Sequence, residues 1–426
     1  MSALEVRLAD ARDVRVGRLV QHGRVMAFEY DPAFLDTGLQ LSPLHLPLRP
    51  GVFEAPPTPF AGLHGVFNDS LPDGWGLLLM DRAFRKRGIT REAITAADRL
   101  SYLGRRGMGA LTYHPETGPD DEGGAVDLAE LAAQSERLLE GSGEDVLPEL
   151  MRAGGSPGGA RPKVVVAYHE RDGSIVSGSD EVPEGYRAYI VKFGSREDPP
   201  DAGTIELAYA AMARAAGIDV PPARLFETRD GGRFFGAERF DRPAGERRHV
   251  HTLAGLLNAD YRLPSLDYEG YLRAAWALTA SHVAVKAAFR RMVFNVLAHN
   301  RDDHAKNFAF LMQPDGTWEL TPAYDLTFSG GPGGEHTMAV AGEGRAPGTR
   351  EFEQVASRMS IPPRESKQIQ EEVAAAVADW PRFAREAGVI RPWIRRIQER
   401  LKTISATTGA EVTPSKTVSR RGRRGN

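Results

Sequence analysis

The chain contains no cysteine among its 426 residues. Disulfide bonds and thiolate metal sites are therefore excluded, and this absence is typical of proteins from a reducing compartment. No stretch approaches the ~18 consecutive apolar residues that would cross a bilayer. The first residues, MSALEVRLAD, carry acidic side chains where a secretory signal would have an apolar core. We expect a soluble cytoplasmic protein with no membrane contact.

The chain also lacks a strong overall charge, because its formal net charge is -3 and its pI is about 6.4. Extensive nucleic-acid binding is not implied by this balance, although a local basic patch is compatible with it. Lysine is scarce, at eight residues. Lys163, Lys192 and Lys306 lie in the segments singled out below, which makes them candidates for a specific role.

Near the N-terminus, apolar and polar residues alternate in short runs, for example in Val14 to Leu19 and Val25 to Tyr30. This pattern predicts strands. Helical periodicity dominates from about residue 246 onward, and its clearest apolar stripe consists of Phe289, Met292, Val293, Val296 and Leu297. The sequence therefore predicts an α+β fold. Its expected regions are a β-rich module at 1–115, a linker and helix at 116–149, a region of strands and a glycine-rich loop at 150–245, a mainly helical lobe at 246–408, and a disordered basic tail at 409–426.

A helix is also expected in the segment FNDSLPDGWGLLLMDRAFRKRG, which begins at Phe67. Asp69 or Ser70 would serve as the N-cap. Trp75, Leu79 and Phe84 would form its apolar stripe.

The segment HNRDDHAKNFAFLMQPDGTWELTPAYDLT, which begins at His299, carries the clearest chemistry. Asp302 and Asn307 are followed by two apolar strands joined by a Pro-Asp-Gly turn, and then by Asp325. The hairpin would return Asp325 to the side of Asn307. Asp302 could orient or deprotonate a hydroxyl, while Asn307 and Asp325 could hold Mg²⁺ through oxygen atoms. This order is that of protein-kinase catalytic and metal loops, and predicts phosphoryl transfer.

Upstream, the segment GGSPGGARPK ends at Lys163 and could bring backbone N–H groups close to a phosphate. It lacks GK[ST] and is not a Walker A loop. Lys192 follows in an apolar strand, where a buried ammonium needs an anionic partner. Glu206, on the next helix, is a candidate for that partner.

Two other readings are compatible with these residues. His299, Asp302, Asp303 and His304 could form a metal-dependent phosphohydrolase site. Alternatively, the chain could be a non-catalytic binding module. The hydrolase reading leaves Lys192 and the glycine-rich loop unexplained.

The chain resembles the HipA family, the bacterial toxin kinases of type II toxin–antitoxin systems. The pieces that carry the resemblance are FNDSLPDGWG (67–76), SPGGARPK (156–163), YIVKF (189–193), GAERFDR (236–242), NRDDHAKNF (300–308) and LTPAYDLT (320–327). The resemblance implies an N-terminal β-rich subdomain and a two-lobed protein-kinase-like core. The kinase N-lobe would span 150–245 and the helical C-lobe 246–408.

Motif positions in this family imply a role for each matching residue. Asp302 corresponds to the catalytic aspartate, Asn307 and Asp325 to the metal ligands, and Lys192 to the phosphate-contacting lysine. The cofactors implied are ATP and Mg²⁺. The expected ATP-binding residues are Ser156, Gly158, Gly159, Ala160, Arg161, Pro162, Lys163, Lys192, Glu238, Arg239, Phe240, His304, Asn307, Tyr324 and Asp325.

The resemblance also implies regulation and partners. Ser156 corresponds to a serine that family members autophosphorylate, and a phosphate there could not share the pocket with ATP. Family toxins phosphorylate translation components, among them aminoacyl-tRNA synthetases. They are neutralised by a separately encoded helix-turn-helix antitoxin, HipB-like, which would bring the toxin to DNA. A serine/threonine kinase toxin is the function that the resemblance predicts. In the non-catalytic alternative, the resemblance implies a module that only binds an antitoxin and DNA.

Overall fold

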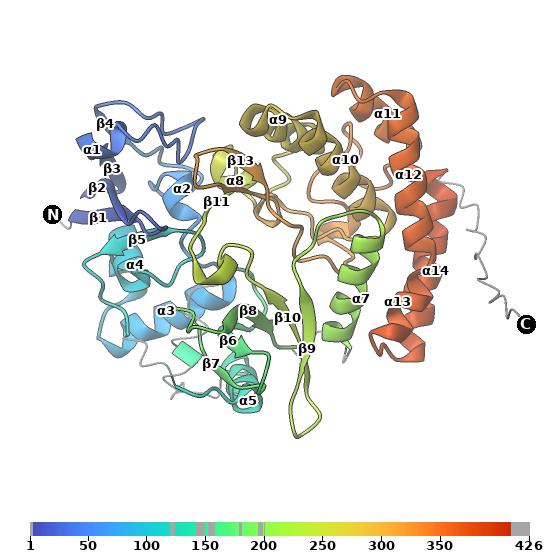
Figure 1. Ribbon diagram of the computed structural model, residues 1–426, viewed down its shortest axis with the longest axis horizontal. Helices are drawn as coiled ribbons and strands as arrows, with labels where there is room; N and C mark the ends of the chain where they lie inside the picture. The colour runs from blue at the N-terminus through green and yellow to red at the C-terminus, as the bar shows by residue number, and fades with distance from the viewer. Residues whose placement is uncertain are drawn as a thin grey trace, which may run out of the picture.

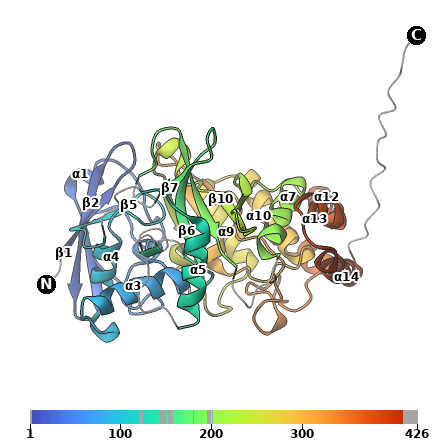
Figure 2. The ribbon, with the colours of Figure 1, turned by 90° about the horizontal axis from the view of Figure 1, so that it is seen from below.

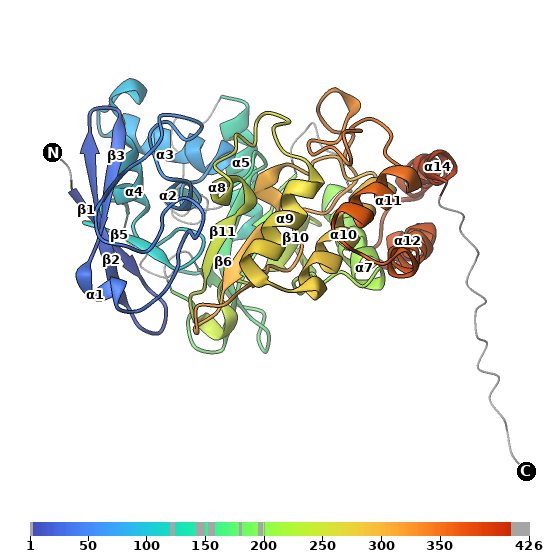
Figure 3. The ribbon, with the colours of Figure 1, turned by 90° about the horizontal axis from the view of Figure 1, so that it is seen from above.

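The computed structural model arranges the chain as a row of three parts (Figure 1). The N-terminal module lies at one end, a second sheet lies in the middle, and the C-terminal helices lie at the other end (Figures 2 and 3). Parts of the expected linker and nearly all of the basic tail lie outside the described residues. The structure describes residues 3–119, 124–141, 150–151, 158–178, 181–194, 199 and 201–409.

The N-terminal module is built on an antiparallel sheet with the strand order β4-β3-β2-β1-β5. Alternating residues of its strands are buried, as in β1, where Leu4, Val6 and Leu8 face the core. The predicted strands are confirmed. The elements are β1 (Ala3–Leu8), β2 (Val14–His22), β3 (Val25–Tyr30), α1 (Pro32–Leu35), β4 (Val52–Glu54), α2 (Gly65–Asn68), α3 (Gly74–Lys86), η1 (Arg91–Ala93), α4 (Ala96–Leu103) and β5 (Leu111–His114).

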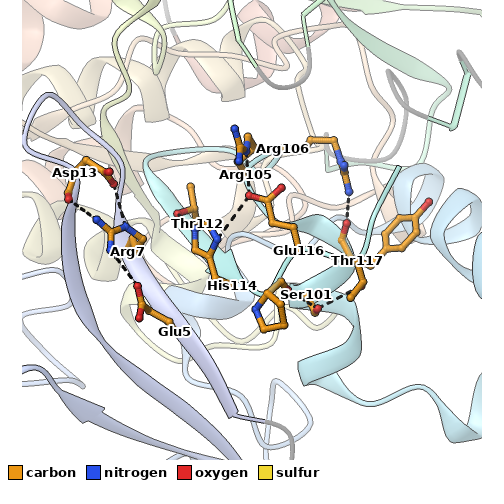
Figure 4. A network of polar contacts seen from close by, with 12 residues as sticks. Glu5, Arg7, Asp13, Ser101, Arg105, Arg106, Thr112, His114, Glu116 and Thr117 are labelled. Carbon is orange, nitrogen blue, oxygen red and sulfur yellow. Dashed lines mark hydrogen bonds and ion pairs between the residues drawn. The ribbon is translucent and has the colours of Figure 1, made fainter. Parts of the chain in front are cut away.

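Networks of polar contacts lie beside β1 and β5 of this module (Figure 4). Arg7 binds Glu5 at 3.0 Å and Asp13 at 3.1 Å. Beyond the end of β5, Arg105 binds Glu116 at 2.9 Å, which ties the chain leaving the sheet back to the loop after α4. These ion pairs are partly exposed, so each contributes little to the stability of the fold.

The second sheet has the order β7-β6-β8-β10-β9 and is also antiparallel. Its strand β6 is buried almost throughout, and α5 packs Leu128, Leu131 and Leu138 against the same core. The elements are α5 (Leu128–Leu139), β6 (Lys163–His169), β7 (Ile175–Ser177), β8 (Tyr186–Lys192), α7 (Ala202–Ala215), β9 (Ala223–Glu227), β10 (Arg233–Glu238) and η2 (Pro243–Gly245).

The C-terminal lobe is mainly helical, as predicted, and carries the short sheet β11-β12-β13. The predicted hairpin is confirmed, because β12 pairs with β13 directly after the loop that holds Asp302. The elements are β11 (His249–Thr252), α8 (Leu253–Leu256), α9 (Tyr268–Thr279), α10 (His282–Leu297), η3 (Ala305–Asn307), β12 (Ala309–Met312), β13 (Trp318–Leu320), η4 (Pro332–Gly334), α11 (Thr349–Arg358), α12 (Pro363–Ala378), α13 (Trp380–Glu386) and α14 (Arg391–Thr408).

The N-terminal module and the C-terminal lobe share one core. Phe28 and Phe67 of the module belong to the same cluster of buried apolar side chains as Leu253 and Phe289 of the lobe. The predicted α+β fold is confirmed, but its first and third parts pack as one body. Among the described residues, no helix is both long enough and apolar enough to span a bilayer.

A polar chain crosses the boundary between the module and the lobe. Asp69 accepts hydrogen bonds from His251 Nδ1 at 2.6 Å and from the Thr252 N–H at 2.7 Å. On its other side, His251 Nε2 lies 3.0 Å from the hydroxyl of Ser42. Asp69 and Ser42 come from the module, whereas His251 and Thr252 belong to β11, so the chain holds the two parts in register.

The predicted N-cap of α3 is wrong. The helix begins at Gly74, and Asp73 occupies the N-cap position in place of Asp69 or Ser70. Asp69 is bound to β11 instead. The helix presents Trp75 and Leu79 to the core of the second sheet, so the module also contributes to the middle part.

Candidate active site

A cavity of about 380 Å³ lies between the second sheet and the C-terminal lobe. Both parts contribute polar side chains to it, together with Asp69 and Asp73 of the N-terminal module. The structure brings almost all of the expected site residues together here. Those that line the cavity are Gly158, Gly159, Ala160, Arg161, Lys163, Lys192, Glu238, Arg239, Phe240, Asp302, His304, Asn307, Tyr324 and Asp325.

Two expected residues are not among them. Ser156 lies outside the described residues. Pro162 is described but does not line the cavity, and its carbonyl accepts the Phe193 N–H at 2.9 Å. Its contact therefore joins β8 to the segment before β6.

Lys163 and Lys192 lie directly opposite each other on β6 and β8. Opposite residues of an antiparallel pair share one face, so both ammonium groups approach the same end of the cavity. Burial lowers the pKa of Lys163 below its ordinary value, against the attraction of Asp325. The Lys192 ammonium lowers the pKa of Lys163 further, because two like charges repel each other.

Lys192 lies between two carboxylates. Its ammonium binds both Glu206 of α7 and Asp325. Burial alone would lower the pKa of Lys192, but Asp325 and Glu206 hold it above its ordinary value. Burial raises the pKa of Glu206, whereas Lys192 holds the pKa of Asp325 well below its usual range against burial. The predicted pairing of Lys192 with Glu206 is confirmed, and Asp325 is the carboxylate that this lysine keeps ionised.

The loop that holds Asp302 follows α10, whose stripe of Phe289, Met292, Val293 and Val296 is buried as predicted. Asp302 projects from this loop with a side chain that is 53% exposed. The Asn307 amide donates to the Asp302 carbonyl at 2.7 Å. Because this bond uses the amide nitrogen, the amide oxygen is the atom that can face a metal ion.

Asp325 is held close to this loop by its neighbour. The Tyr324 hydroxyl donates to the Lys306 carbonyl at 2.7 Å, so the chain returns beside Asn307 after the hairpin, as predicted. Asp325 itself has φ of 54°, in the left-handed region that Asp tolerates better than most residues. An ionised carboxylate and an amide oxygen at one end of the cavity match the oxygen ligands that Mg²⁺ prefers.

The cavity lining also includes an aromatic part. Phe240 stacks on Tyr324, with ring centroids 5.6 Å apart. The Glu238 and Arg239 N–H groups both donate to protein carbonyls, those of Pro222 and Ala188. The Arg239 guanidinium turns away to a buried pair with Asp241, at 2.7 Å, so its side chain has a structural contact.

The cation and anion pattern fits a nucleotide with a metal ion. The cavity lining combines glycine backbone, the two lysines, the aromatic ring of Phe240 and the oxygen donors Asn307 and Asp325. Within the described part of the chain, His304 Nδ1 is buried without a hydrogen-bond partner. The residues present therefore suit ATP and Mg²⁺.

The phosphohydrolase reading does not fit this geometry. Asp303 is fully buried and accepts bonds from Tyr268, His336 and Thr337, each at 2.7 Å. His299 packs on Phe328 and lies 3.2 Å from the guanidinium of Arg400. Across the described ranges, no three His, Cys, Asp or Glu side chains are grouped to hold a metal ion.

Sequence reasoning missed part of the site. Asp73 and Asp69 line the cavity but are far from the other lining residues in sequence. Asp73 binds Lys306 at 3.0 Å, and Lys306 lies over the ring of Tyr261 at 4.6 Å. The segment containing Asp73 was noted as part of a helix and of the family resemblance, but no local signal assigned Asp73 to the cavity.

Known proteins support this description of the fold. A solved structure of HipA from Shewanella oneidensis MR-1, in a complex with HipB and its operator DNA, has a TM-score of 0.70 and 18% sequence identity. The match covers 95% of this chain and 97% of that one, and it shows a shared fold. The kinase CtkA of Helicobacter pylori matches 53% of this chain with 12% identity and a TM-score of only 0.33.

Sequence comparison gives the family. A protein of Sinorhizobium fredii (strain NBRC 101917 / NGR234), named "Putative kinase Y4dM", is 28% identical over 280 residues, which is 61% of each chain. This chain thus matches about three fifths of that relative's length. The profile described as HipA N-terminal domain matches residues 4–114, and that of the HipA-like C-terminal domain matches residues 155–380. Because the second match alone spans more than half of the sequence, the chain belongs to the HipA family.

Proposed function

We propose that this protein is a Mg-ATP-dependent serine/threonine protein kinase that acts as the toxin of a type II toxin–antitoxin system. The observation that carries the proposal is that one cavity holds Asp302, Asn307 and Asp325 beside the Lys192–Glu206 pair. This set combines a group for the acceptor hydroxyl, a pair for a metal ion and a cation for a phosphate.

Each residue would have a separate part in the reaction. Asp302 orients the acceptor hydroxyl and takes up its proton, and its exposed side chain can be reached by another protein. Lys192 neutralises phosphate oxygens, and Asn307 and Asp325 hold the metal ion. Bound Mg-ATP would supply the phosphoryl group, and its metal ion would balance the negative charge of the phosphates.

The kinase proposal is tested with the purified full chain, Mg²⁺ and labelled ATP. Asp302→Asn should lower labelling of the chain or of an added protein by a factor of about 100 to 10,000, because a positioned general base contributes that much. Asp315→Asn is the matched control, since Asp315 lies in the β12–β13 turn and binds only Thr317 among the contacts described. Full labelling in Asp302→Asn would contradict the role of Asp302.

ATP binding is tested separately by thermal unfolding. A ligand that binds only the folded state must raise the Tm. If Mg-ATP left the Tm unchanged, the kinase proposal would fail in favour of a non-catalytic module.

The toxin role rests on family membership and on the relative solved with HipB and operator DNA. We infer a separately encoded helix-turn-helix antitoxin that brings the chain to DNA, a translation component such as an aminoacyl-tRNA synthetase as the substrate, and autophosphorylation at Ser156. Mass spectrometry after incubation with ATP should find the phosphate on Ser156 in the wild type. A neighbouring reading frame that encodes no such antitoxin would argue against the assignment.

A further inference from the structure

The segment from Asp73 to Trp75, outside both kinase lobes, contacts the glycine-rich loop directly. Asp73 accepts the N–H of Gly159 through its carboxylate. The Trp75 N–H donates to the Gly159 carbonyl at 3.0 Å, and the indole N–H donates to the Lys163 carbonyl at 3.0 Å. Both polar groups of the Gly159 backbone are therefore bound by the N-terminal module.

The backbones themselves touch at this point. A Cβ atom on Gly74 would lie 2.6 Å from Ala160 Cα and 2.7 Å from the Gly159 carbonyl oxygen, so no side chain fits there. Gly74 has φ of +39° and Gly159 has φ of +100°, backbone conformations that favour glycine. The contact between the module and the loop is thus specified by the backbone of both segments.

Asp73 also reaches the catalytic loop. Its other carboxylate oxygen binds Lys306 Nζ at 3.0 Å, one residue from the expected metal ligand Asn307. Asp73 occupies the N-cap position of α3, yet its side chain makes no capping bond to the described residues of that helix. Burial alone would raise the pKa of Asp73, but Lys306 and the Gly159 N–H hold it below its ordinary value.

We propose that Asp73 and Trp75 are positioning residues of the active site, through which the N-terminal module fixes the nucleotide loop relative to the catalytic loop. The inference rests on the proposed ATP site and deepens it. A loop held in its bound conformation loses less conformational entropy when the phosphates bind, so the contact raises ATP affinity. Adenosine lacks phosphates, so this contact should not affect its affinity.

The test compares Asp73→Asn with the wild type in the full chain. Asparagine keeps the N-cap preference of aspartate, so α3 should remain intact, while the charge facing Lys306 is lost. The Kd and KM for Mg-ATP should rise about tenfold because a buried charge-assisted bond is removed. The Kd for adenosine and the kcat should change less than about twofold if the loss is confined to phosphate positioning.

Asp127→Asn is the matched control. Asp127 is the N-cap of α5 and accepts the Ala129 N–H at 2.9 Å, away from the cavity lining. In a Lys306→Met background, Asp73→Asn should add less than about twofold to the Kd for ATP, since the partner of its charge is already gone.

Trp75→Phe provides a second variant should Asp73→Asn fail to fold. It removes the indole donor to the Lys163 carbonyl and should also weaken ATP binding more than adenosine binding. If both variants bound ATP as tightly as the wild type, or more tightly, the positioning role would be overturned. If the wild type bound neither ligand, the proposed function would fail with it, which is a distinguishable result.

Discussion

His249 is a buried imidazole at the contact between β11 and the N-terminal module, where its Nε2 lies 3.0 Å from the Leu41 carbonyl. Burial lowers the pKa of His249 to about 4. In the unfolded chain, histidine has its ordinary pKa of about 6.5. Between these two values the unfolded state binds more protons, so the free energy of unfolding falls as the pH drops through this window.

We expect this histidine to make unfolding easier by about 2 kcal/mol when the pH falls from about 7 to about 5. His249→Gln keeps a donor for the Leu41 carbonyl but does not titrate. The free energy of unfolding of this variant should therefore fall by about 2 kcal/mol less than that of the wild type over the same pH range. Urea unfolding at both pH values measures the difference. If the free energy of unfolding of His249→Gln fell as much between the two pH values as that of the wild type, the assignment would be refuted.

Some residues of the site could be assigned to it from the sequence and others could not. Asp302, Asn307 and Asp325 lie within one local segment, so spacing and turn chemistry were sufficient to group them. Asp73 is 86 residues from Gly159 and 233 residues from Lys306. Nothing in the periodicity around Asp73 encodes such distant partners, and the cap predicted for this helix was Asp69 or Ser70.

At the scale of elements, α2 and α8 approach so closely that their backbones are in contact. A Cβ on Gly65 would lie 2.1 Å from the Gly255 carbonyl oxygen, and a Cβ on Gly255 would lie 2.4 Å from the Asp69 carboxylate. This packing holds Asp69 against the start of α8, where it binds Thr252. The close approach explains why the module and the lobe have one core.

Gly65→Ala should therefore destabilise the protein by about 3 kcal/mol, because backbone atoms must move to admit the methyl group. Gly124→Ala is the matched control, since a Cβ there meets nothing within 4 Å. The control should change the free energy of unfolding by less than about 1 kcal/mol. Urea denaturation of both variants gives the comparison, and equal stability would mean that α2 can shift away from α8.

The strands and long helices were predictable because their signals are local. The alternation in β2 and β3 and the stripe on α10 identified these elements before any contact was known. The start of α3 was not predictable in the same way. Asp69 has the residue type of a cap but is drawn to His251 and Thr252, which are about 180 residues away in sequence.

For the whole molecule, the shared core predicts that the second sheet and the C-terminal lobe do not fold without the N-terminal module. A chain lacking residues 1–115 would lose Trp75 and Leu79 from the core of the second sheet and Phe28 and Phe67 from the core of the C-terminal lobe. We expect it to show no cooperative thermal transition and no ATP-dependent rise in Tm, because its two remaining cores are incomplete.

The control is a chain that ends at Gly409, the residue that terminates α14 in a left-handed conformation. It keeps every described contact and should unfold at the temperature of the full chain. Circular dichroism during heating distinguishes the two truncations. A cooperative, ATP-responsive transition in the chain without residues 1–115 would show that the module is a separable domain.

The chain of Ser42, His251 and Asp69 has a further consequence for how active sites are recognised. Its distances, 3.0 Å and 2.6 Å, are those of a serine hydrolase triad. Ser42 is 1% exposed and His251 is 0% exposed, so no ester or amide can approach the hydroxyl. A search by atomic geometry alone would select this trio as a nucleophile with its base. Solvent access, rather than spacing, separates a catalytic triad from three side chains that join two parts of a fold.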